Sequence, residues 1–110
     1  KNNESITITW DGEQRRDFTH VNNIVRGLIK MSEGDWSGET FNLGTANNYS
    51  INELADMFGK DYPKKYIPKR DGDSRSTLAD LSFSKKHLGY EPIETLKEYM
   101  EEWMEENKWI

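Results

Sequence analysis

The sequence contains no cysteine and only two histidines among its 110 residues. Without cysteine there is no disulfide framework, no thiolate metal site and no thiol nucleophile. Two histidines are too few for a histidine-rich metal centre. No apolar run approaches the roughly 18 residues of a membrane span, and no signal-peptide pattern is visible. We therefore expect a cytoplasmic protein without a resident metal.

Positive charge is also scarce. Fifteen Lys and Arg face twenty Asp and Glu, for a net charge of −5, and proteins that bind the phosphate backbone of nucleic acids carry basic patches instead. Hydrophobic residues make up only 34% of the chain. A chain this short buries about two-thirds of its unfolded surface, so we expect part of its apolar surface to serve a neighbour. Because the sequence begins with Lys1 rather than Met, we expect it to be cut from a longer reading frame or processed.

Two hydrophobic periods occur in the first third of the chain. Alternation of apolar and polar residues predicts a strand over 6–10, which ends at the turn Asp11-Gly12. From His20 the apolar spacing becomes that of one helix face and predicts a helix that stops near 32–34. The apolar positions of that face are Val21, Ile24, Val25, Leu28 and Ile29.

Capping residues and short apolar runs predict the remaining elements. Ser50 and Glu53 have the spacing of a capping box, as do Thr95 and Glu98, and each pair predicts a helix after it. Another helix is predicted over 82–88. Short extended segments are predicted at 40–43, 65–67 and 77–80. Because strands alternate with helices, the predicted class is mixed α/β with about four helices.

No set of residues forms a convincing catalytic centre. The sequence has no Gly-x-Gly-x-x-Gly and no phosphate loop with Gly-Lys-Ser/Thr. His20 opens a predicted helix, where histidine is more often a structural hydrogen-bonding residue than a base, and His87 lies on a solvated, Lys-rich stretch. Asp71 and Asp73 lie in a turn, where Asp commonly bonds nearby amides. Residue chemistry alone favours a binding or structural domain.

Two basic segments have two explanations. Arg15-Arg16 follows a predicted strand and precedes a helix, and Arg70 follows a strand and a proline. The planar guanidinium group suits bidentate phosphate recognition, so two Arg brought together by the fold could clamp a diphosphate while a nearby carboxylate binds ribose hydroxyls. The other explanation is surface ion pairing, of Arg16 with Asp17 or of Arg70 with Asp73. The spacing leaves both open.

The chain also carries a series of motifs in a characteristic order. Residues 11–21, Asp-Gly-Glu-Gln-Arg-Arg-Asp-Phe-Thr-His-Val, resemble a motif of the extended short-chain dehydrogenases, the NAD-dependent nucleotide-sugar epimerase/dehydratase family. Similar family motifs follow in order at 24–29, 39–45, 50–54, 70–73, 79–80 and 88–92. Motifs in the correct order over nearly the whole chain are far more specific than any one of them.

The resemblance implies that residues 1–110 form one nucleotide-sugar-binding portion, roughly the last third of a Rossmann-type enzyme. The N-terminal NAD-binding half, with its Gly-rich loop and Tyr-x-x-x-Lys pair, is then absent. By the same resemblance Arg16 and Arg70 meet the diphosphate and Asp73 holds the nucleotide ribose. Asn22-Asn23 departs from the family pattern of one or two acidic residues, which puts the local hydrogen bonding in doubt.

The complete enzyme is expected to use NAD as a transient oxidant, as an epimerase or a dehydratase. For this chain alone we expect no catalysis and no cofactor, only binding energy for a nucleotide-diphosphate sugar. The alternative is a free-standing, non-catalytic nucleotide-binding or interaction module. The apolar helix face, with Phe41 and Leu43, is expected to stay without a partner and to drive self-association or docking on a missing Rossmann half. The sequence does not distinguish the base, the sugar or the reaction.

Overall fold

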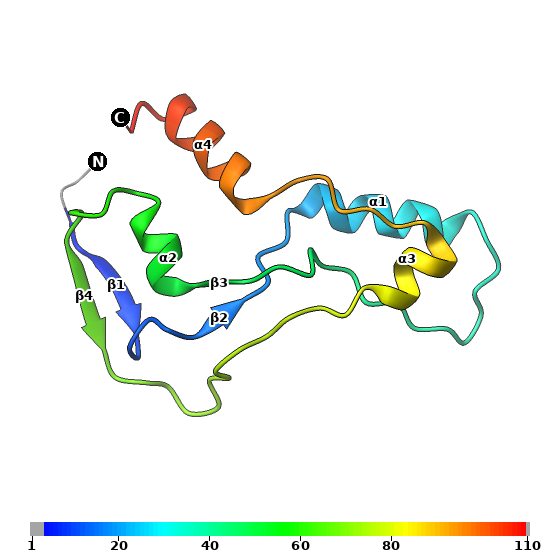
Figure 1. The fold of residues 1–110 in the computed structure, drawn as a ribbon, viewed down its shortest axis with the longest axis horizontal. Coiled ribbons are helices and arrows are strands. Elements are labelled where there is room, and N and C mark those ends of the chain that lie inside the picture. Colours follow the sequence, from blue (N-terminus) through cyan, green and yellow to red (C-terminus); the bar gives the residue numbers. More distant parts are fainter. Residues whose placement is uncertain (1–3, 110) are drawn as a thin grey trace.

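The computed structural model describes residues 4–109 as an open, elongated α/β arrangement (Figure 1). Its extents are 50 × 35 × 17 Å and its radius of gyration is 16.8 Å, whereas a compact domain of this length has about 13 Å. The strands of residues 6–9 and 64–67 lie at one end, and the helices of residues 21–32 and 82–88 lie at the other. The mixed α/β class predicted from the sequence is confirmed.

A two-stranded parallel sheet joins β1 (Ile6–Thr9) to β4 (Lys64–Ile67), with Ile8 opposite Tyr66. The alternation seen in the sequence places Ile8 in the core, where 1% of its surface is exposed. Both strands were predicted within a residue of their observed bounds. Trp10 extends the pairing by one bond, because its amide donates to the carbonyl of Ile67 at 2.8 Å.

A second, very short sheet pairs β2 (Arg15–Arg16) with β3 (Tyr49–Ser50) in antiparallel register. Two residues are too few to show a period, so the sequence did not predict either strand. α2 (Ile51–Asp56) begins directly after β3, and the Ser50 hydroxyl accepts from the Glu53 amide at 3.0 Å. This confirms the predicted helix start.

Helix α1 (Val21–Ser32) has the predicted bounds, but its buried face is not the apolar one. Asn23 and Gly27 are buried, and a Cβ on Gly27 would lie 2.6 Å from the Leu43 side chain. The apolar face predicted from the sequence remains largely exposed. The exposed fractions of Val21, Val25, Leu28 and Ile29 are 66%, 44%, 52% and 53%. The exposed apolar surface expected from the sequence is therefore present, whereas Ile24, Phe41 and Leu43 are half-buried.

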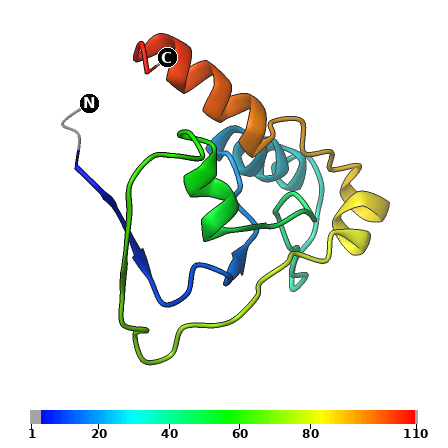
Figure 2. The same cartoon turned by 60° about the vertical axis from the view of Figure 1, so that its left-hand side comes forward.

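Two more helices complete the chain, α3 (Ser82–Leu88) and α4 (Leu96–Glu106). Both were predicted, and the Thr95 hydroxyl accepts from the Glu98 amide at 3.2 Å as the capping box requires. α3 contacts α1, while α4 lies beside α2 in both views (Figure 2). Phe58, after α2, packs its ring against Trp103 of α4, with ring centroids 5.9 Å apart.

Two predicted extended segments do not become strands. Residues 40–43 form no ladder, and residues 77–80 follow a single bridge between Arg15 and Ser76. A strand needs a neighbouring strand for its backbone groups, and residues 4–109 offer none at 40–43. The buried apolar residues are few: Ile8, Ala55, Leu81, Tyr90, Met100 and Met104. None of the described helices is long and apolar enough to cross a membrane.

Candidate anion-binding site

Arg16, Arg70 and Asp73 come from two segments that the fold places side by side. Arg16 ends β2, and Arg70 and Asp73 lie in the loop that follows β4. The bridge between Arg15 and Ser76 attaches the end of this loop to β2. The structure therefore brings the loop alongside the strand that carries Arg16, although the two are more than 50 residues apart in the sequence.

The guanidinium group of Arg16 donates to backbone carbonyls. Its Nη1 lies 2.7 Å from the oxygen of Arg15, and its Nη2 lies 2.8 Å from the oxygen of Ser74. The ion pairs formed within residues 4–109 do not include Arg16. Arg16 therefore contacts the residue that follows Asp73 in the sequence.

Arg70 and Asp73 form a loose ion pair. The Arg70 Nε lies 3.8 Å from the Asp73 Oδ2, and the side chains are 76% and 19% exposed. The same oxygen accepts from the Arg70 amide at 3.4 Å. Because exposed pairs of this kind contribute little to stability, Arg70 can turn toward an anion at low cost.

Asp17 is not the partner of Arg16, so that surface ion pair is not formed. Its carboxylate accepts from the amides of Thr45 at 3.0 Å, Ala46 at 3.0 Å and Ala79 at 3.3 Å. Asp17 thereby ties the chain after β2 to two distant segments. The approach is close at Gly44, where a Cβ would lie 2.6 Å from the Cβ of Ala79.

Arg15 also has a structural role rather than a free guanidinium group. Its Nη1 pairs with Glu53 at 2.8 Å, while its Nε and Nη2 donate to Asn48. It holds β2 against α2 and the turn before β3. Of the two neighbouring arginines, Arg15 has a carboxylate partner within residues 4–109 and Arg16 has none.

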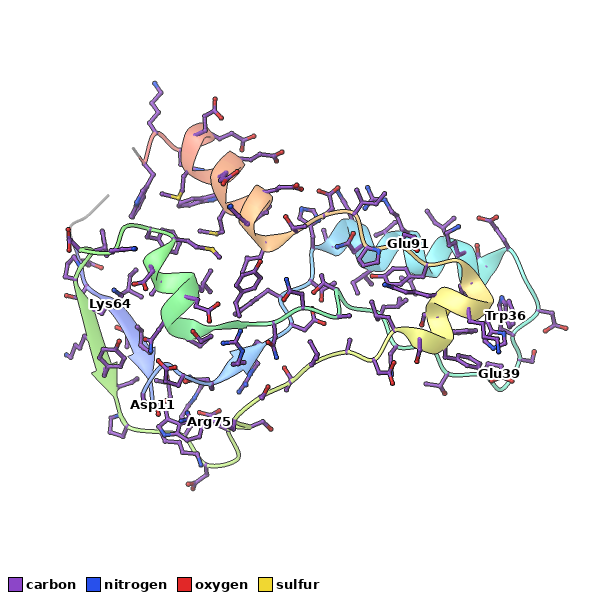
Figure 3. All side chains as sticks on the ribbon, viewed as in Figure 1. Asp11, Trp36, Glu39, Lys64, Arg75 and Glu91 are labelled. Carbon is purple, nitrogen blue, oxygen red and sulfur yellow. The ribbon has the colours of Figure 1, made fainter. Side chains whose placement is uncertain are left out.

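A second group of charges, around Trp10, was not singled out from the sequence. Lys69 Nζ lies 4.4 Å and Arg75 Cζ 4.3 Å from the centroid of the Trp10 ring. Arg75 also makes a two-pronged ion pair with Asp11, at 2.7 and 2.8 Å (Figure 3). Since 64 residues separate Asp11 from Arg75, no local pattern could have revealed the pair.

This pair changes the acidity of Asp11. The hydrogen bonds from Arg75 lower the pKa of the Asp11 carboxyl to about 2, with a smaller contribution from the Glu13 amide. The same pairing raises the pKa of Arg75 above its usual value. Asp11 therefore stays ionised and holds Arg75 across the whole range near neutral pH.

The two histidines have no arrangement for catalysis. His20 caps α1, since its Nδ1 accepts from the Asn22 amide at 2.9 Å, which confirms the expected structural role. His87 is exposed, as expected, and also packs on the Phe83 ring with centroids 4.3 Å apart. Within residues 4–109 no cluster of three His, Asp or Glu side chains could hold a metal ion.

Asn23 makes the hydrogen bonds that the departure from acidic residues had put in doubt. Its Oδ1 accepts from the amides of Ile93 at 2.9 Å and Glu94 at 3.1 Å, and its Nδ2 donates to the Glu94 carbonyl at 2.8 Å. An amide can both donate and accept, whereas a carboxylate only accepts. Asn23 joins α1 to the segment before α4.

An apolar pocket of about 300 Å³ lies between the starts of α1 and α4. A smaller pocket of about 130 Å³ shares Phe18, Thr95 and Leu96 with it. The larger pocket is lined by Phe18, Thr19, His20, Val21, Thr95, Leu96 and Tyr99. Neither of these two pockets includes Arg16, Arg70 or Asp73 among its lining residues.

Comparisons with known proteins agree with the motif order. Residues 1–44 match the model of the NAD dependent epimerase/dehydratase family. The chain is 36% identical over 110 residues to a UDP-glucuronate 4-epimerase of Thermodesulfobacterium geofontis, covering 93% of this chain and 34% of that protein. It is 32% identical over 99 residues to UDP-glucuronic acid decarboxylase 6 of Arabidopsis thaliana, covering 86% and 29%.

A comparison with solved structures also finds an epimerase. The crystal structure of UDP-glucuronic acid 4-epimerase from Bacillus cereus, in complex with UDP-glucuronic acid and NAD, matches with a TM-score of 0.80 at 28% identity. The match covers 96% of this chain and 36% of that one. The chain thus spans about a third of the length of the curated relatives and solved structures that it matches.

Proposed function

We propose, since this chain belongs to the NAD-dependent epimerase/dehydratase family, that it is the C-terminal, substrate-binding portion of a nucleotide-sugar epimerase or dehydratase. Arg16 and Arg70 bind the diphosphate, and Asp73 accepts hydrogen bonds from the nucleotide ribose. The observation that carries the proposal is the hydrogen bond from Arg16 to the Ser74 carbonyl at 2.8 Å. This bond joins an arginine without a carboxylate partner to the loop that contains Arg70 and Asp73.

The charges around this contact favour an anion over a neutral ligand. Arg16 donates to two carbonyls and keeps its full charge. Arg70 exchanges a 3.8 Å contact with Asp73 for the closer, bidentate contacts that phosphate oxygens provide. Asp73 then has oxygen lone pairs for ribose hydroxyls.

Hydride and proton transfer belong, in this proposal, to the part of the protein outside this chain. The sequence contains neither Gly-x-Gly-x-x-Gly nor Tyr-x-x-x-Lys. The contribution of these residues is to fix the diphosphate, so that the sugar is held in one orientation at the reacting centre. We expect the purified chain to bind no NAD in calorimetry and to convert no nucleotide sugar when NAD is added.

Titration calorimetry with UDP tests the proposal. We expect weak binding, because the walls around the base and sugar are absent from this chain. Arg16→Ala and Arg70→Ala should each weaken it by about 1.5–3 kcal/mol, the value of a hydrogen bond to a charged group. The matched control is Lys86→Ala, which removes a charge from exposed α3 at the other end of the molecule. Unchanged affinity in both arginine variants would refute the assigned roles.

A free-standing interaction module is the second candidate. The exposed residues of α1, from Val21 to Ile29, favour it, since an apolar helix face of this kind usually serves an interface. The two functions differ in their response to UDP. An interaction module binds its partner equally well with Arg16 or Arg70 replaced.

A further inference from the structure

Trp10 adopts a backbone conformation that a bulky residue rarely takes. Its φ is 68°, in the left-handed region where a side chain larger than that of glycine or asparagine is disfavoured. The chain must turn there, because Trp10 ends the β1–β4 pairing. A residue keeps such a strained backbone conformation only where the surrounding structure holds it there.

The contacts of the Trp10 ring show what this conformation achieves. Lys69 and Arg75 both lie over the ring, at 4.4 and 4.3 Å, and they are the residues on either side of the segment 70–74. Both ends of the segment that contains Arg70 and Asp73 are thus held at one aromatic side chain. Asp11, next to Trp10, completes the attachment through its ion pair with Arg75 (Figure 3).

Little else holds the segment 70–74 in place. Within it, the Asp73 amide donates to the Arg70 carbonyl at 3.3 Å, and Gly72 turns the chain with a φ of 84°. From outside, Arg16 donates to the Ser74 carbonyl. These residues are exposed apart from the half-buried Asp73, so no packed core fixes their conformation.

We propose that Trp10 is a positioning residue for the anion-binding loop. By binding Lys69 and Arg75 through cation–π contacts, its ring restricts the loop to the conformation in which the Ser74 carbonyl accepts from Arg16. This inference rests on the proposed function, because it assigns Trp10 a role at that same site. Trp10 itself touches no ligand; it raises affinity by increasing the fraction of chains whose loop is ready to bind.

Four variants distinguish the contribution of the Trp10 ring from that of the backbone conformation at a positive φ. Trp10→Gly and Trp10→Asn remove the ring and tolerate a positive φ, so both should keep the turn at this position. Trp10→Phe keeps an aromatic ring. Ala46→Gly is the matched control, since Ala46 also has a positive φ, of 59°, and lies in another turn. Two measurements are made on each variant: calorimetry with UDP, and the fast backbone motion of amides 70–74 by ¹⁵N relaxation without ligand.

We expect the glycine and asparagine variants to bind UDP about fivefold to thirtyfold more weakly, the factor for two lost cation–π contacts, and to show increased motion at 70–74. Trp10→Phe and Ala46→Gly should stay within about twofold of the wild type. Equal affinity in Trp10→Gly overturns the inference and leaves the proposed function standing. Unchanged motion at 70–74 overturns it as well. If the wild type does not bind UDP, the proposed function fails, and the relaxation data alone decide whether the ring orders the loop.

Discussion

Replacing Asn23 by Ala should be among the most damaging single changes to this chain. Asn23 is fully buried, with 0% of its surface exposed, and its amide satisfies three backbone groups of the segment before α4. Those groups are the N–H of Ile93, the N–H of Glu94 and the carbonyl of Glu94. Alanine has no polar side-chain atom, so all three backbone groups lose their hydrogen-bond partner.

The expected loss follows from this count. A buried polar group left without a partner costs about 1–3 kcal/mol, but Ile93 is exposed and Glu94 half-buried, so water can reach part of the gap. We therefore expect Asn23→Ala to lower the free energy of unfolding by about 2–4 kcal/mol. Asn23→Asp should also lower the free energy of unfolding, because its carboxylate accepts from both N–H groups but cannot donate to the Glu94 carbonyl.

Urea denaturation followed by circular dichroism and tryptophan fluorescence measures these values. Asn22→Ala is the control, since Asn22 is exposed on the same helix and should change stability by less than about 0.5 kcal/mol. If Asn23→Ala does not fold, hydrogen exchange in the wild type gives the answer, because the amides of Ile93 and Glu94 should be protected. An Asn23→Ala variant as stable as Asn22→Ala would show that these bonds do not hold α1 to the chain before α4.

Three further predictions concern acidity, burial and assembly. Arg75 lowers the pKa of Asp11 to about 2. The stabilising effect of this ion pair is therefore present above the usual Asp pKa of about 3.9 and is lost as the pH falls toward 2. Carboxyl NMR should give a titration midpoint near 2 for Asp11, and Arg75→Gln should return that midpoint toward the usual value. Burial raises the pKa of Tyr90, so its contribution is complete below the usual Tyr value of about 10 and is lost at higher pH. Tyr90→Phe should cost about 1–3 kcal/mol in urea denaturation at pH 7, because the Gly44 carbonyl loses its donor, and an unaltered midpoint would contradict this. The exposed face of α1 should cause the chain to self-associate in sedimentation experiments, and Leu28→Glu should weaken the association. A wild-type chain that stays monomeric at high concentration would contradict this prediction.

The local signals in the sequence determined the helices and where they begin. Ser50, Thr95 and His20 each cap a helix through a bond to an amide two or three residues away, so the information lies within a short window. The strand at 6–9 was equally predictable from its alternation. The order of the motifs also identified the family and with it the candidate residues Arg16, Arg70 and Asp73, whose binding roles stay a prediction.

Only the tertiary structure decided which surfaces and side chains meet. The sequence predicted that the apolar side of α1 would lack a partner, but it did not show that the side packed in this chain carries Asn23 and Gly27. The segment 40–43 has the composition of a strand but no partner to pair with among the described residues. Arg75 reaches Asp11, and Asp17 reaches Ala79, across more than 60 residues. Caps depend on atoms a few residues apart, whereas pairing and burial depend on which distant segments the chain brings together.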